Sequence, residues 1–239
     1  MEVMEVEDRD FLQKRAEQEE QIGFIRKVLG IVAVQMALTF AMSATASAFT
    51  SVGTFVMNPF VQFLCLFVLI ISLCVLVCSE KTRRTVPGNY LWLFALTLAE
   101  ATSIASMAAE LEIFSVLTAI MATCLVTACL FFAALYTSTS VNIGRLVRNM
   151  VIGVVAACLL NIALLLWMLV TWNFRDSNLV IVSSMLSVVI VGFYIMMVLL
   201  MIILPGAMDK DDYILAALRL YLELVRLFFY LLVILGKKK

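Results

Sequence analysis

Long, almost uninterrupted runs of apolar residues fill most of the chain, and short polar stretches separate them. A helix of about 20 residues, rising about 1.5 Å per residue, crosses the hydrocarbon core of a bilayer. The runs do not alternate in polarity as the strands of a β-barrel would. They therefore predict an all-α, polytopic transmembrane bundle of seven helices, over 28–50, 60–78, 88–109, 113–136, 149–171, 179–204 and 213–235.

Composition agrees with this pattern: 64% of the 239 residues are hydrophobic, 14% are charged, and the mean hydropathy is +1.08. Globular domains are nearer half apolar, so a lipid bilayer is the expected surrounding. The formal net charge is zero and no basic cluster interleaves with aromatic residues, so we expect no nucleic-acid partner.

The loops are too short for a separate soluble domain, so we expect one bundle domain over 28–236, preceded by a polar segment, 1–27, and followed by a basic tail, 237–239. The polar segment has mixed charge and no signal-peptide pattern. Two interpretations remain open for it: a helix on the aqueous face, or a partly ordered tail.

Basic residues near the helix ends predict the orientation, because cytoplasmic loops carry more Lys and Arg. They concentrate on the side of the N-terminus, which we therefore place in the cytosol or matrix. The tail of Lys237, Lys238 and Lys239 would lie on the far side if 213–235 crosses fully. A full crossing is favoured by length, and a short or re-entrant last segment is the alternative. The bases on the N-terminal side are Arg26, Lys27, Lys81, Arg83, Arg84, Arg145, Arg148 and Lys210.

The sequence has no histidine, no phosphate-binding glycine motif and no pair of aspartates inside the spans, so we expect no enzymatic activity. Its six cysteines fall in apolar runs without polar neighbours, so we expect buried reduced thiols and no firm metal site. Stretches rich in small residues, 41–51, 101–109 and 121–130, predict close helix–helix contacts, with a water-filled pathway as the alternative.

Four ionisable residues lie inside the predicted spans: Glu100, Arg219, Glu223 and Arg226. Charged groups at this depth cost about 2.5–3.5 kcal/mol each, so they are candidates for function. The spacings i,i+4 and i,i+3 place the last three on one helix face, and we expect Glu100 to meet that face in the bundle interior.

Two interpretations of this cluster remain open. It is a neutralised brace that holds the last helix, or a site at which Glu223 and Glu100 bind or relay a cation with the arginines as a latch. Near the start of the last helix, Asp211 or Asp212 is expected to act as its cap rather than as part of an ion site.

Three segments resemble one family. The end of the chain, DDYILAALRLYLELVRLFFYLLVILG (211–236), resembles the C-terminal signature of the Bax-inhibitor-motif (lifeguard) membrane proteins. FIRKVLGIVAVQMALT (24–39) is similar to their opening segment, and KTRRTVPGNYLWLFALTLAEA (81–101) to their basic loop and third span with a glutamate, here Glu100. The similarity covers about 22–236.

This resemblance implies a seven-helix bundle whose last helix is central or partly re-entrant. It also implies a pH-sensitive Ca²⁺ leak from internal stores and restraint of cell death, with endoplasmic reticulum or Golgi as the usual membrane. The mitochondrial inner membrane is an alternative. The family's ion switch is attributed to two aspartates, one in the sixth span and one in the seventh.

The sequence departs from the family at this switch. The seventh-span acid matches Glu223, but the sixth-span acid falls on Val198 within YIMMVLL (194–200). Arg219 and Arg226 stand where the family has asparagines. Two carboxylates at one site titrate as a coupled pair, whereas one glutamate between two arginines is expected to stay ionised.

Two functional hypotheses follow. The chain is a Ca²⁺ or proton leak protein that uses Glu223 and Glu100, and we expect no cofactor apart from a bound Ca²⁺. Alternatively, it is a diverged, non-conducting accessory subunit that contacts other membrane proteins through its small-residue faces and its N-terminal segment.

Overall fold

The computed structural model describes residues 2–140, 143–171 and 177–239, and in these residues it is all-α. Each of the seven predicted spans lies on a long helix, which confirms the bundle. These helices are α1 (Glu2–Ala48), α3 (Pro59–Cys78), α5 (Gly88–Ala109), α6 (Ile113–Ser140), α7 (Ile143–Thr171), α8 (Ser177–Ile203) and α9 (Tyr213–Leu235).

Short helices occupy stretches that the sequence pattern left as connections: α2 (Thr50–Val56), α4 (Glu80–Arg84) and the 3₁₀ turn η1 (Lys210–Asp212). The described residues thus contain nine α-helices rather than seven. The helix α2 packs against the end of α1 because Gly53 lacks a side chain: a Cβ there would lie 3.0 Å from the Ala46 carbonyl oxygen. Most of the predicted connection between the fifth and sixth spans, 172–176, lies outside the described residues.

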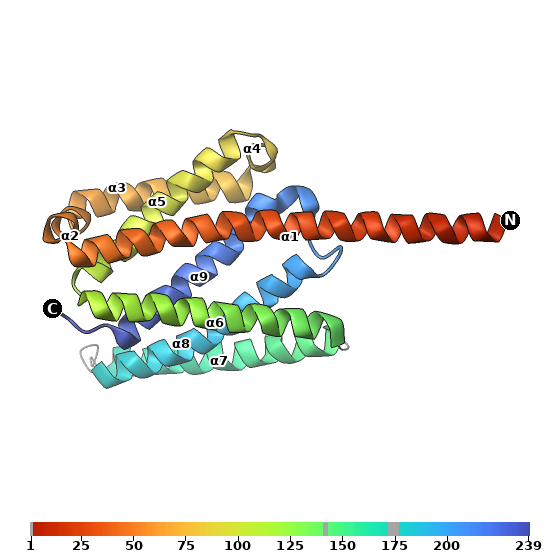
Figure 1. The fold of residues 1–239 in the computed structure, drawn as a ribbon. Helices are drawn as coiled ribbons and strands as arrows, with labels where there is room; N and C mark the ends of the chain where they lie inside the picture. Colours follow the sequence, from red (N-terminus) through yellow and green to blue (C-terminus); the bar gives the residue numbers. More distant parts are fainter. Residues whose placement is uncertain (1, 141–142, 172–176) are drawn as a thin grey trace.

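The long helices run back and forth along one axis, and the two termini lie at opposite ends of the molecule (Figure 1). The first part of α1 projects beyond the bundle as one continuous helix, while α9 runs along the inside from one end to the other. The last segment is therefore one continuous helix inside the bundle, without the turn that a re-entrant hairpin needs.

The inner position of α9 follows from its residue pattern. Its apolar face packs on α1, α6 and α8, and Tyr221 and Phe228 on this face are completely buried. The Phe228 ring makes an edge contact with Phe40 of α1, with the ring centroids 5.0 Å apart. A helix packed on several sides is fixed more firmly than one that faces lipid, because it makes more van der Waals contacts.

Large apolar side chains cover the outside of the bundle, among them Phe60, Phe63, Phe114 and Met121. Such a surface would be unfavourable in water, whereas the hydrocarbon of a bilayer is equally apolar. Among the described helices, five are long and apolar enough to cross a membrane, namely Arg15–Ala48, Pro59–Cys78, Gly88–Ala109, Ile113–Ser138 and Leu179–Ile203. The chain is an integral membrane protein.

The expectation of buried cysteines is wrong. Cys74, Cys78, Cys124 and Cys129 are exposed on the helix surfaces, and the other two are partly exposed. An apolar run identifies a membrane span but not which of its faces meets lipid, so burial inside the protein did not follow from the run.

Small residues do bring helices together where two of the predicted stretches meet. Ala46 of α1 packs with Ala105 and Ala109 of α5 and with Val56 of α2. Contacts between α1 and α5 extend along much of both helices. The prediction of close packing is confirmed for 41–51 and 101–109.

The last residues fold against the far end of the bundle. The Glu112 amide donates to the Lys237 carbonyl at 2.8 Å, and the Lys239 amide donates to that of Glu110 at 3.1 Å. The Lys237 and Lys238 ammonium groups lie 3.6 Å from the carboxylates of Glu112 and Glu110, respectively. Basic residues are expected on the side of the N-terminus, and this tail lies at the other end of the bundle. Nearby carboxylates thus balance the charges of Lys237 and Lys238 there.

Candidate functional site

The charged residues of α9 form one clear ion pair. Arg226 Nη1 donates to Glu223 Oε1 at 2.9 Å across one helical turn. The carboxylate belongs to a residue that is only 8% exposed, whereas 62% of the Arg226 side chain is exposed. The pair therefore connects the interior of the bundle to its surface.

Arg219 does not join this pair, although its i,i+4 spacing to Glu223 suggested that it would. Its side chain is exposed and makes no ion pair with any residue that the structure describes. Sequence order offers a reason: in a helix, an acid that precedes its base interacts better than a base that precedes its acid. Arg226 follows Glu223, and Arg219 precedes it.

Glu100 lies half-buried on α5, near enough to the Arg226 guanidinium for Coulombic attraction. It also interacts electrostatically with Tyr221, whose hydroxyl is 3.0 Å from Thr39 Oγ1. No hydrogen bond or salt bridge joins Glu100 to α9 among the described residues. Of the predicted contacts between Glu100 and the α9 charges, the described residues therefore show only Coulombic attraction between Glu100 and Arg226.

Two cavities open beside Glu223, between α7, α8 and α9. One is about 510 Å³ and is lined by Arg219, Tyr194 and Val198 together with Glu223. The other is about 400 Å³ and adds Arg226 and a group of polar side chains: Asn161, Ser187 and Tyr230. Asn161 Nδ2 donates to Ser187 Oγ at 2.8 Å.

Val198 therefore faces the same cavity as Glu223, with its own side chain 4% exposed. The family resemblance identified Val198 as the position of the missing sixth-span acid. In the structure, an acid at this position would share a cavity with Glu223. The polar partners Asn161 and Tyr194 were missed at the sequence level. Isolated polar residues in an apolar run carry little signal until the helices are placed.

A second charged cluster lies at the end of the bundle nearer the N-terminus. The Arg83 guanidinium donates to the carbonyl oxygens of Leu76 and Val77, at 3.2 Å and 3.0 Å, and reaches the Asp212 carboxylate at 3.4 Å. The neighbouring Arg84 contacts Asp209 at 2.8 Å. Desolvation is the largest single influence on Arg84 and lowers its pKa, but the nearby carboxylates of Glu80, Asp212 and Asp209 together outweigh it and raise the pKa of this side chain.

The prediction that the side chain of Asp211 or Asp212 caps α9 is wrong. Asp212 occupies the N-cap position but makes no capping hydrogen bond with its side chain. Asp209 instead accepts from the Asp211 amide at the start of η1. The described residues contain no cluster of three or more His, Cys, Asp or Glu side chains suited to a metal ion.

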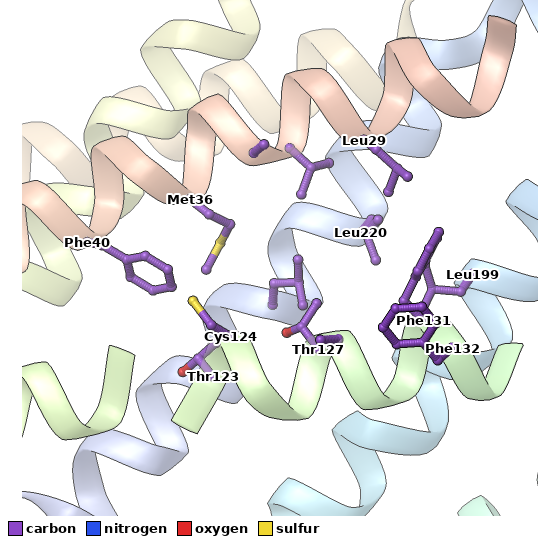
Figure 2. Close-up of a pocket in the computed structure, with 14 residues that line it drawn as sticks. Leu29, Met36, Phe40, Thr123, Cys124, Thr127, Phe131, Phe132, Leu199 and Leu220 are labelled. Carbon is purple, nitrogen blue, oxygen red and sulfur yellow. The ribbon is translucent and has the colours of Figure 1, made fainter. Parts of the chain in front are cut away.

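Another cavity, of about 370 Å³, lies between α1 and α6 and reaches α8 and α9 (Figure 2). Met36 and Phe40 point into it from α1, and Phe131 and Thr127 from α6. Part of the third small-residue stretch lines this cavity. The side chains are nearly all apolar, which does not support a water-filled pathway along this stretch.

Comparison with known proteins places these features in context. The family described as "Inhibitor of apoptosis-promoting Bax1" matches residues 21–239. Protein lifeguard 4 of Mus musculus is 26% identical over 213 residues, which cover 89% of this chain and 84% of that protein. The Golgi anti-apoptotic protein of Vaccinia virus (strain Lister) is 28% identical over 212 residues, with the same coverage of each chain. No solved structure matches the chain significantly.

Proposed function

Because the chain belongs to the family of inhibitors of apoptosis-promoting Bax1, we propose that it restrains cell death from a Golgi or endoplasmic reticulum membrane by a slow leak of Ca²⁺ or protons. The proposed pathway passes the cavities beside Glu223. In this proposal the role is not enzymatic, and no cofactor takes part apart from the conducted ion.

The observation that carries the proposal is the position of Glu223. Its carboxylate is the buried acid on α9, and it borders two cavities that also hold arginine, tyrosine, asparagine and serine side chains. A buried carboxylate beside a cavity with polar side chains can bind a cation transiently as the cation crosses the membrane.

The ion pair also suggests how such a leak is kept slow. Arg226 occupies one oxygen of Glu223 at 2.9 Å and would compete with a cation for it. The pathway would therefore conduct only when the guanidinium moves away. The 62% exposure of the Arg226 side chain gives it space to do so.

Flux into liposomes tests the proposal. The purified protein is reconstituted with a Ca²⁺-sensitive or pH-sensitive dye inside, and influx is followed from acidic to neutral pH. We expect Glu223→Gln to abolish the flux and Arg226→Gln to increase it. Glu112→Gln, on the surface at the far end, is the matched control and should leave the flux unchanged.

Absence of flux at any pH, in the wild-type protein and in Glu223→Gln alike, would rule out the leak. A second candidate function would then take its place: a non-conducting accessory subunit. Two observations favour that alternative, namely the engaged Glu223 carboxylate and the apolar Val198 in the same cavity. Its signature is a stoichiometric complex with another membrane protein that survives size-exclusion chromatography in mild detergent.

A further inference from the structure

We propose that a groove between α1 and α5 binds one anionic phospholipid of the cytosolic leaflet. The groove has a volume of about 690 Å³ and lies apart from the cavities around Glu223. Arg26 and Lys27 border it at one end, and Val34, Leu38 and Phe94 line it further along. It therefore combines a cationic end with an apolar body, as a lipid headgroup and acyl chain require.

The apolar body results from the spacing of residues along α1. Gly23, Gly30, Val34 and Leu38 recur at intervals that place them on one face of a helix. Both glycines leave open space, since a Cβ at either would meet no atom within 4 Å. The missing side chains create the depression into which an acyl chain fits.

The two basic residues at the cationic end of the groove form no ion pair within the described residues. Arg26 is exposed and makes no ion pair with any residue within the described ranges. Lys27 lies over the Tyr213 ring, 5.7 Å from its centroid, and this contact leaves its positive charge without an anion. Of the acids that share a cavity with Lys27, Glu20 contacts Lys210 at 2.7 Å and Asp209 contacts Arg84, whereas Asp211 is exposed and forms no ion pair within the described residues.

Length and orientation select the leaflet. From Arg26 to Leu38 the helix rises about 18 Å, close to the roughly 15 Å thickness of one leaflet. The excess of basic residues near this end of the bundle predicts that it faces the cytosol in a Golgi or endoplasmic reticulum membrane, and the cytosolic leaflet carries the anionic lipids. The cavity in Figure 2 has no charged residue in its lining, so it offers nothing that would select a headgroup.

Native mass spectrometry of the full chain tests the proposal. The protein is reconstituted in nanodiscs of phosphatidylcholine with added phosphatidylserine, extracted gently and examined for retained lipid. We expect one phosphatidylserine per chain. Each basic residue near a membrane surface strengthens lipid binding about fivefold, so Arg26→Gln with Lys27→Gln should lower the preference about thirtyfold.

Two matched variants separate this site from general surface charge. Lys81→Gln removes an exposed base on the same side of the membrane, away from the groove, and should keep the phosphatidylserine. Gly30→Leu extends a side chain into the groove from a position where a Cβ would meet no atom within 4 Å, and it should displace the lipid, whereas Gly153→Leu, at a similarly open position on α7, should not.

Equal retention of phosphatidylserine and phosphatidylcholine by the wild-type protein would overturn the proposal. So would an equal loss in Lys81→Gln and in the double variant, because general surface attraction would then explain the binding. Melting temperatures of all variants, measured in phosphatidylcholine alone, identify any that are misfolded. If the double variant fails this check, Gly30→Leu against Gly153→Leu decides.

Discussion

Replacing Arg226 by alanine should destabilise the bundle far more than replacing Arg219. The change removes the guanidinium that holds the buried Glu223 carboxylate at 2.9 Å. A carboxylate left without its partner in a buried position keeps its desolvation cost and loses the compensating attraction. Arg219 has no such partner among the described residues, although both arginines belong to the same helix.

The structure sets the size of the effect. Breaking a fully buried ion pair costs about 3–5 kcal/mol, and a hydrogen bond to a charged group is worth about 1.5–3 kcal/mol. Since 62% of the Arg226 side chain is exposed, we expect a loss below that of a fully buried pair, about 2–3 kcal/mol, in the upper part of the range for a charged hydrogen bond. For a chain of this length that corresponds to a melting temperature lower by about 4–12 °C.

Thermal unfolding in one detergent, followed by tryptophan fluorescence, measures both variants. Arg219→Ala is the matched control and should change stability by less than about 0.5 kcal/mol. The double variant Glu223→Gln with Arg226→Ala should recover part of the loss, because no charge is then left unpaired. Equal melting temperatures for the two single arginine variants would refute the reasoning.

Three further substitutions test the ends of the bundle by the same melting assay. Gly236→Ala should cost about 1–3 kcal/mol, because its Cβ would clash with the Leu232 carbonyl oxygen and would also meet the Leu111 side chain at 2.8 Å, and an unchanged melting temperature would show that the tail is not packed there. Lys239→Met should cost about 1–2 kcal/mol by removing the donor from two helix-terminal carbonyl oxygens; a loss no larger than that of Lys238→Met would argue against this contact. Arg83→Met should cost about 2–3 kcal/mol and the exposed Arg84→Met less than about 1 kcal/mol, and the reverse order would contradict the assigned burial.

Much of the fold could be predicted from the sequence because a bilayer imposes a length and a polarity on every span. All seven apolar runs are helices in the structure. The short helices α2 and α4 escaped prediction, since they are only 7 and 5 residues long and fit no membrane pattern. Their ends depend on local side chains, such as Ser79, which accepts a hydrogen bond at the start of α4.

The candidate site was predicted less completely. Helical spacing correctly placed Glu223 within reach of Arg226, because residues three apart share a helix face. The same rule allowed Arg219 to pair as well, and it does not. Spacing along one helix describes which residues are neighbours, but the surroundings of that helix decide which rotamer each side chain adopts.

By itself, the sequence determined that this protein is a helical membrane protein of a recognisable family. It also determined which ionisable residues lie in its spans and which acidic residue of the family is missing. These properties depend on residue type, on order and on the thickness of a bilayer. Only the tertiary structure decided that Val198 and Glu223 share a cavity, that Lys237 and Lys238 meet acids at the far end, and that a groove opens along α1. The reason is that lipid is as apolar as the protein interior, so hydropathy cannot distinguish a face that packs from one that faces lipid.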